Sequence, residues 1–151
     1  MRWPTLILFL WFAAAGVTQS AAAEGRIIKV LPHFLDRQGR HALSPSLYDR
    51  DAYQAVLRKN PDKRSGVRFD IHWKAKFAGA NPLKLRIELR GTRPGEEQSL
   101  EHAVHNKGVF SHWSALTVQD EAYEQLGEVV AWRATLWEGE HMIAEQRSFL
   151  W

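Results

Sequence analysis

The sequence contains no cysteine among its 151 residues. This absence excludes disulfide bonds, thiolate metal ligands, a cysteine nucleophile and a lipid-modified N-terminal cysteine. Long hydrophobic runs are also scarce: the run at residues 6–15 falls well short of the about 20 residues that a membrane-spanning helix needs. Charge of one sign is not concentrated either, since the formal net charge is +3 with acids and bases interleaved. We therefore expect no nucleic-acid partner, because proteins of that kind carry a concentrated basic stretch or face.

The first 23 residues have the composition of a secretory signal peptide. Arg2 supplies a positive charge, the apolar run follows, and Ala21-Ala22-Ala23 precedes Glu24. This order of a charged region, an apolar region and small residues is typical of a cleaved leader. We predict cleavage after Ala23, which leaves residues 24–151 as one exported domain, periplasmic or secreted, with no transmembrane segment.

The rest of the chain has the composition of one globular domain, because 45% of the sequence is hydrophobic and 25% is charged. Residues 67–77 show a strict period of two, with apolar side chains at odd positions and polar ones between them. This pattern predicts a strand with one buried face and one solvent-exposed face. Residues 83–89 alternate in the same way, and residues 79–82 contain glycine and proline. The two strands are therefore predicted to pair as an antiparallel hairpin.

Shorter patterns predict the remaining elements. Residues 27–31 favour a first strand that ends at Pro32. Ser46, with Asp49 three residues later, indicates a helix start, and Asn60-Pro61 indicates its end. We expect this helix to pack on the sheets through Tyr48, Ala52, Tyr53, Val56 and Leu57. Further strands are expected at residues 100–105, 109–118, 128–137 and 142–151, with a helical turn within 119–127.

About seven short strands separated by turn signals are typical of a β-sandwich. The predicted fold is an immunoglobulin-like or fibronectin III-like antiparallel sandwich, with one short helix inserted between the first two strands. The disulfide that joins the two sheets of antibody domains is excluded because the sequence has no cysteine.

The sequence has no pattern that predicts catalysis or a cofactor. The seven histidines follow no metal-ligand spacing, and no G-x-S-x-G motif is present. We expect a protein that is not an enzyme, with no cofactor and no catalytic or metal-binding residues. Whether some histidines converge in space stays open.

Two groups of residues are candidates for ligand binding. In the predicted hairpin Lys76 lies opposite Lys84 and Lys74 lies opposite Arg86, which would make a basic patch for an anionic envelope polysaccharide or protein. Three tryptophans are the other candidates: Trp113, Trp137 and Trp151. Exposed and coplanar indole rings would stack on sugars. The favoured function is a non-enzymatic binding or structural module that contacts a protein or the cell envelope. The alternatives are a carbohydrate-binding module and, after it, a metal-binding protein or hydrolase.

Overall fold

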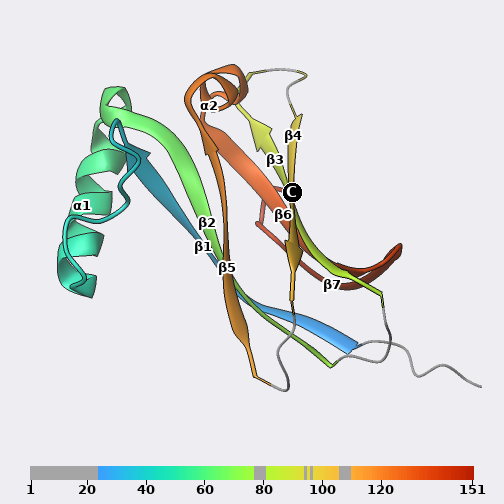
Figure 1. The fold of residues 1–151 in the computed structure, drawn as a ribbon. Coiled ribbons are helices and arrows are strands. Elements are labelled where there is room, and N and C mark those ends of the chain that lie inside the picture. The colour runs from blue at the N-terminus through green and yellow to red at the C-terminus, as the bar shows by residue number, and fades with distance from the viewer. Residues whose placement is uncertain (1–23, 77–80, 94, 96, 106–109) are drawn as a thin grey trace, which may run out of the picture.

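The protein is a β-sandwich of two antiparallel sheets, described from a computed structural model over residues 24–76, 81–93, 95, 97–105 and 110–151 (Figure 1). The three-stranded sheet has the order β1-β2-β5 and the four-stranded sheet has the order β4-β3-β6-β7. The strands are β1 Glu24–Asp36, β2 Arg64–Lys76, β3 Leu83–Gly91, β4 Glu97–Val104, β5 His112–Gln119, β6 Val129–Glu138 and β7 His141–Arg147. The helices are α1 Leu47–Lys59, the 3-10 turn η1 Pro61–Lys63 and α2 Asp120–Leu126.

The core lies between the two sheets and follows the predicted alternation. On β2 the buried apolar side chains are Val67, Phe69, Ile71, Trp73 and Ala75, and on β3 they are Leu83, Leu85, Ile87 and Leu89. The period-two prediction is confirmed for both strands, except for Phe77, which lies outside the described residues. The even-numbered side chains of β2 and β3 therefore form parts of the two outer faces, where any ligand would meet the sheets.

The predicted hairpin between β2 and β3 is wrong. β2 pairs with β1 and β5, whereas β3 pairs with β4 and β6, so the two strands lie in different sheets. Their buried faces point at each other across the core. An alternating pattern shows that a strand has one buried face, and it does not show whether the next strand lies beside it or opposite it.

β1 is longer than predicted and continues through Pro32 to Asp36. Pro32 is tolerated because β1 is an edge strand, with β2 as its partner on one side. On the other side, near its end, β1 is covered by α1. The Gln54 side chain accepts a hydrogen bond from the Phe34 amide (2.8 Å) and donates one to the Phe34 carbonyl (2.9 Å). One glutamine thus satisfies both groups that a neighbouring strand would otherwise have paired.

The predicted ends of α1 are confirmed, since Ser46 is the N-cap and accepts from the Asp49 amide, and Asn60 is the C-cap. Its predicted packing face is partly wrong. Leu57 is buried and Tyr53 is half-buried, but Tyr48 is 84% exposed. Val56 and Ala52 are exposed as well. The buried face of α1 differs from the predicted one because Gln54 faces β1 and bonds to its backbone. The hydropathy of the sequence does not reveal these bonds.

Arg64, at the start of β2, bonds to the C-terminal end of α1. Its Nε donates to the Leu57 carbonyl (2.6 Å), and its Nη2 donates to the Arg58 carbonyl. A cation suits the carbonyl-rich end of a helix. The same guanidinium pairs with Glu128 (3.2 Å) and lies 4.0 Å from the centre of the Phe34 ring.

β6 and β7 form an antiparallel hairpin, with Gly139 at φ 56° in the turn between them. The last strand is shorter than predicted, because β7 ends at Arg147 rather than at Trp151. Ser148 instead turns back onto β6: its amide donates to the Trp132 carbonyl (2.9 Å), and its hydroxyl accepts from the Trp132 amide (3.0 Å).

Candidate functional site

The candidate binding residues lie on two opposite outer faces. Lys74, Lys76 and Trp113 belong to the β1-β2-β5 sheet, whereas Lys84, Arg86 and Trp137 belong to the β4-β3-β6-β7 sheet. Trp151 joins the second group, because its ring lies 4.1 Å from the Arg90 guanidinium of β3. The patch predicted from the hairpin is therefore not formed, and the three tryptophans do not share one platform.

The positive charges on the outer face of the four-stranded sheet are paired. Glu101 of β4 accepts from Lys84 (3.0 Å) and from Arg86 (2.5 Å). These hydrogen bonds from Lys84 and Arg86 lower the pKa of the Glu101 carboxyl. The Arg86 guanidinium also lies 5.0 Å from the centre of the Trp137 ring. Both cations are thus balanced by a carboxylate within the protein, so this face attracts an anionic ligand less than a face of unpaired cations does.

The same holds further along this face. Arg90 pairs with Glu97 (2.9 Å), and Arg133 pairs with Glu88 (2.6 Å). Both guanidinium groups lie against the ring of Trp151, at 4.1 and 5.1 Å from its centre. The indole is half-buried under them, so its face is not open for stacking on a sugar.

The outer face of the three-stranded sheet has unpaired positive charges. Arg26 of β1 lies directly opposite Lys74 of β2, and Lys29 lies opposite His72. Within the described part of the chain, Arg26, Lys29 and Lys74 have no carboxylate partner. Like charges directly opposite each other on neighbouring strands destabilise a sheet.

An exposed tryptophan completes this face. Trp113 of β5 lies opposite His72 and is 55% exposed. Its ring stacks on the imidazole with centroids 4.5 Å apart and planes 5° from parallel. We call Arg26, Lys29, His72, Lys74 and Trp113 the basic face.

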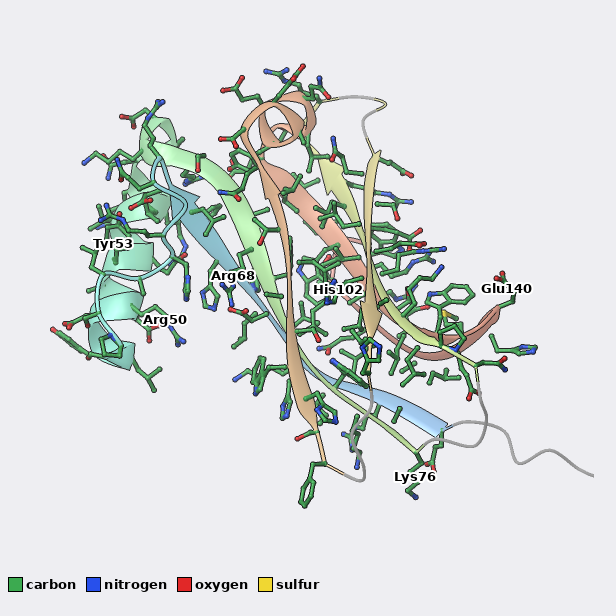
Figure 2. All side chains as sticks on the ribbon, in the orientation of Figure 1. Arg50, Tyr53, Arg68, Lys76, His102 and Glu140 are labelled. Atoms are coloured by element: carbon green, nitrogen blue, oxygen red, sulfur yellow. The ribbon has the colours of Figure 1, made fainter. Side chains whose placement is uncertain are left out.

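The basic face lies on the half of the sheet that is far from α1. In Figure 2 this half is found by the labelled Lys76, which lies at the end of β2 far from the helix. The Lys76 side chain pairs with Glu24 (3.2 Å), so its charge is balanced. A hollow of about 340 Å³ lies beside it, lined by Glu24, Gly25, Arg26, Lys74, Ala75 and Lys76.

Arg26 and Lys29 are the residues that sequence reasoning missed. Only the pairing of β1 with β2 brings them beside Lys74, and the predicted hairpin assigned that place to Arg86. A β-bulge between Ile27 and Lys29 also interrupts the alternation, which places Lys29 on the same face as Arg26 despite its odd number. A first strand that began at Glu24 rather than at Ile27 would have been the signal for Arg26.

A second polar cluster lies on the same sheet beside α1, around His33 and His41. Their rings are 5.6 Å apart, and the His33 Nε2 lies 3.6 Å from the Asp70 carboxylate. Asp70 also pairs with Arg68 (2.8 Å), on the side of β2 toward α1 (Figure 2). Burial lowers the pKa of both histidines, and Arg68 lowers both further, against the opposing effect of Asp70.

These lowered pKa values predict that acid destabilises the fold. Because the unfolded chain binds protons more readily at His33 and His41, stability is lost as pH falls below the ordinary histidine value of 6.5. Urea unfolding at a series of pH values should show a smaller decline in the His33→Gln variant than in the native protein. His102, exposed on β4, is the control, and an equal change in His102→Gln would contradict the assignment.

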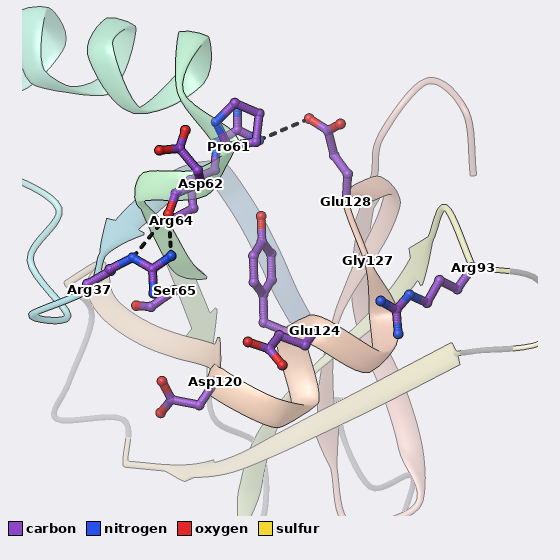
Figure 3. Close-up of a pocket in the computed structure, with 11 residues that line it drawn as sticks. Arg37, Pro61, Asp62, Arg64, Ser65, Arg93, Asp120, Glu124, Gly127 and Glu128 are labelled. Carbon is purple, nitrogen blue, oxygen red and sulfur yellow. Dashed lines mark hydrogen bonds and ion pairs between the residues drawn. The ribbon is translucent and has the colours of Figure 1, made fainter.

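A polar cavity of about 480 Å³ lies at one end of the sandwich, between η1 and α2 (Figure 3). Its charged residues are Arg37, Asp62, Arg64, Arg93, Asp120, Glu124 and Glu128. Arg37 donates to the Asp62 carbonyl (2.6 Å) and Arg64 pairs with Glu128. Three of these described residues are basic and four are acidic, so the lining does not favour one sign of charge.

Comparisons with known proteins do not identify these sites. No protein-family model matches the chain, and no curated protein or solved structure is significantly similar to it. Across residues 24–151, apart from the gaps given above, no three histidine, aspartate or glutamate side chains are grouped to hold a metal ion. None of the helices in the described ranges has the length and hydropathy needed to cross a bilayer.

Proposed function

We propose that this protein is an exported, non-enzymatic binding module that recognises an acidic polysaccharide through the basic face. We also propose that its sandwich belongs to the immunoglobulin-like class, in the fibronectin III-like form. The sheet orders β1-β2-β5 and β4-β3-β6-β7 support this assignment, because they correspond to strands A-B-E and C′-C-F-G of that class.

The observation that carries the proposal is the direct opposition of Arg26 and Lys74, neither of which forms an ion pair with a carboxylate of the described residues. Every arginine and lysine of the central strands on the other sheet has an acidic partner, as described for Lys84, Arg86, Arg90 and Arg133. The contrast favours a ligand that supplies the missing negative charge at the basic face.

Trp113 favours a sugar over other anions. One side of its ring is stacked on His72, and the side chain still exposes more than half of its surface. Aromatic rings bind the apolar faces of sugars, while the neighbouring lysine and arginine side chains bind carboxylate or sulfate groups. A chain of uronic acids offers both features at short intervals.

We expect the protein to be retained on immobilised polygalacturonate at low salt and to elute as salt screens the charges. In the double variant Arg26→Gln, Lys74→Gln retention should be lost, because two of the three unpaired cations are removed. The matched control is Lys84→Gln, Arg86→Gln, which removes the same charge from the paired face. Equal loss of retention in both variants would show ion exchange by net charge alone and would contradict the proposal.

Trp113→Ala separates sugar binding from simple charge attraction. The variant should bind polygalacturonate more weakly and bind polyacrylate, an anionic polymer without sugar rings, as well as the native protein does. Affinity electrophoresis in gels containing each polymer measures both. Equal weakening on the two polymers would contradict a role for the indole in recognising sugars.

A further inference from the structure

A third hollow opens between the two sheets, on the side where β1 faces β6. This cavity of about 270 Å³ is lined chiefly by Phe34, Phe69, Val129, Val130 and Trp132, and Arg58 is the one charged residue among the described lining. Phe69 belongs to the core and contacts Trp132 edge to face, with ring centres 6.4 Å apart. The cavity is thus an apolar opening that reaches the interior of the sandwich.

The opening exists because β7 is short. Its pairing with β6 runs from Arg133 to Glu138, so Val129–Trp132 have no β7 residue beside them. A full-length last strand would cover this stretch of β6 and close the seam between the sheets.

The cavity is not built to receive another strand. The Phe34 amide and carbonyl on the β1 side are both bonded to Gln54. On the β6 side, both backbone groups of Trp132 are bonded to Ser148. Since the backbone groups at these positions are satisfied, the cavity suits an inserted apolar side chain better than an added strand.

A side chain of the right kind lies next to the opening. Phe149 is 100% exposed, and it directly follows Ser148, which lines the cavity. It does not fill the cavity of its own chain, because Ser148 is bonded to Trp132 and Trp151 is stacked against Arg90 on the outer face. A cavity of about 150 Å³ accepts benzene, so the volume here is ample for a phenyl ring.

We propose that two copies of this chain associate about a two-fold axis, with Phe149 of each copy inserted into the cavity of the other. An aromatic side chain and its receptor on adjoining parts of one surface are what a self-complementary two-fold interface requires. Val130 and Leu150 are also exposed and would be covered in the same contact. Arg58 would face the inserted ring, where a cation is favourable. The proposal is independent of polysaccharide binding, since the basic face is formed by other residues.

Sedimentation velocity of the purified protein over a range of concentrations tests the proposal. We expect a monomer–dimer equilibrium, and in Phe149→Ala a dissociation constant at least about tenfold higher, as for loss of a buried aromatic anchor. Because Phe149 is exposed in one copy, its removal should leave the thermal unfolding of the monomer unchanged. Phe110→Ala is the matched control, since Phe110 is 75% exposed before β5 and away from the cavity. A monomer at every concentration, or equal weakening by both variants, would overturn the proposal.

A mixing experiment tests the reciprocal insertion itself. Val130→Arg places a second cation beside Arg58 at the cavity and should also prevent association. Phe149→Ala keeps an intact cavity and Val130→Arg keeps an intact Phe149, so a mixture can form one of the two insertions. We expect the labelled mixture to associate more tightly than either variant alone. A mixture no tighter than the separate variants would contradict insertion between copies.

Discussion

Replacing Trp73 by alanine is expected to lower the free energy of unfolding by about 3–5 kcal/mol. The indole is 1% exposed in the middle of the core, and its Nε1 donates to the Ser114 hydroxyl (3.0 Å). The variant would leave a cavity between the sheets and would remove the donor to a partly buried hydroxyl. Urea unfolding followed by circular dichroism measures the change.

The neighbouring tryptophan is the control for this prediction. Trp113 lies on the outer face, and its removal costs only the stacking on His72, so Trp113→Ala should change the free energy of unfolding by about 1 kcal/mol or less. If the two variants lost similar stability, the assignment of odd-numbered β2 residues to the interior would be wrong.

Asp36→Asn is expected to lower the free energy of unfolding by about 2 kcal/mol at neutral pH. The carboxylate is buried and accepts from the Tyr53 hydroxyl (2.6 Å), the Arg40 Nε (2.8 Å) and the amides of Gln38 and Arg40. These hydrogen bonds outweigh the cost of burial and lower the pKa of Asp36 from 3.8 to about 2. The stabilisation is therefore present above pH 3.8 and is lost as pH falls toward 2.

The difference between the native protein and Asp36→Asn should shrink as unfolding is measured at successively lower pH through this interval. Asp62→Asn serves as the control, because Asp62 contacts Arg37 through its backbone carbonyl rather than its side chain. A difference that stayed constant with pH would contradict the lowered pKa of Asp36.

The sequence predicted the faces of the strands better than their partners. The alternation over residues 67–77 and 83–89 follows directly from burial of one side, and it correctly separated the interior from the surface. Which strand lies beside which depends on contacts between distant segments, such as β2 with β5, and the local pattern contains no record of them. The basic patch was misassigned for the same reason.

Polar side chains that serve the backbone were the other source of error. Gln54 is buried because it substitutes for a missing neighbour of β1, and Ser148 ends β7 because it bonds to Trp132. Both residues have ordinary hydropathy for an exposed position. Sequence reasoning therefore extended the last strand to residue 151 and placed the wrong side of α1 against the sheet.

The guanidinium of Arg64 has a consequence for how the inserted helix moves. It joins the last carbonyls of α1 to Glu128 beside β6, while Gln54 joins the middle of the helix to β1. The segment between β1 and β2 is thus bonded to both sheets, and an outward movement of the helix would break the bonds of Gln54 and Arg64. A partner that reached the surface beneath α1 would first have to break these bonds, so the accessible recognition surfaces are those that the helix does not cover.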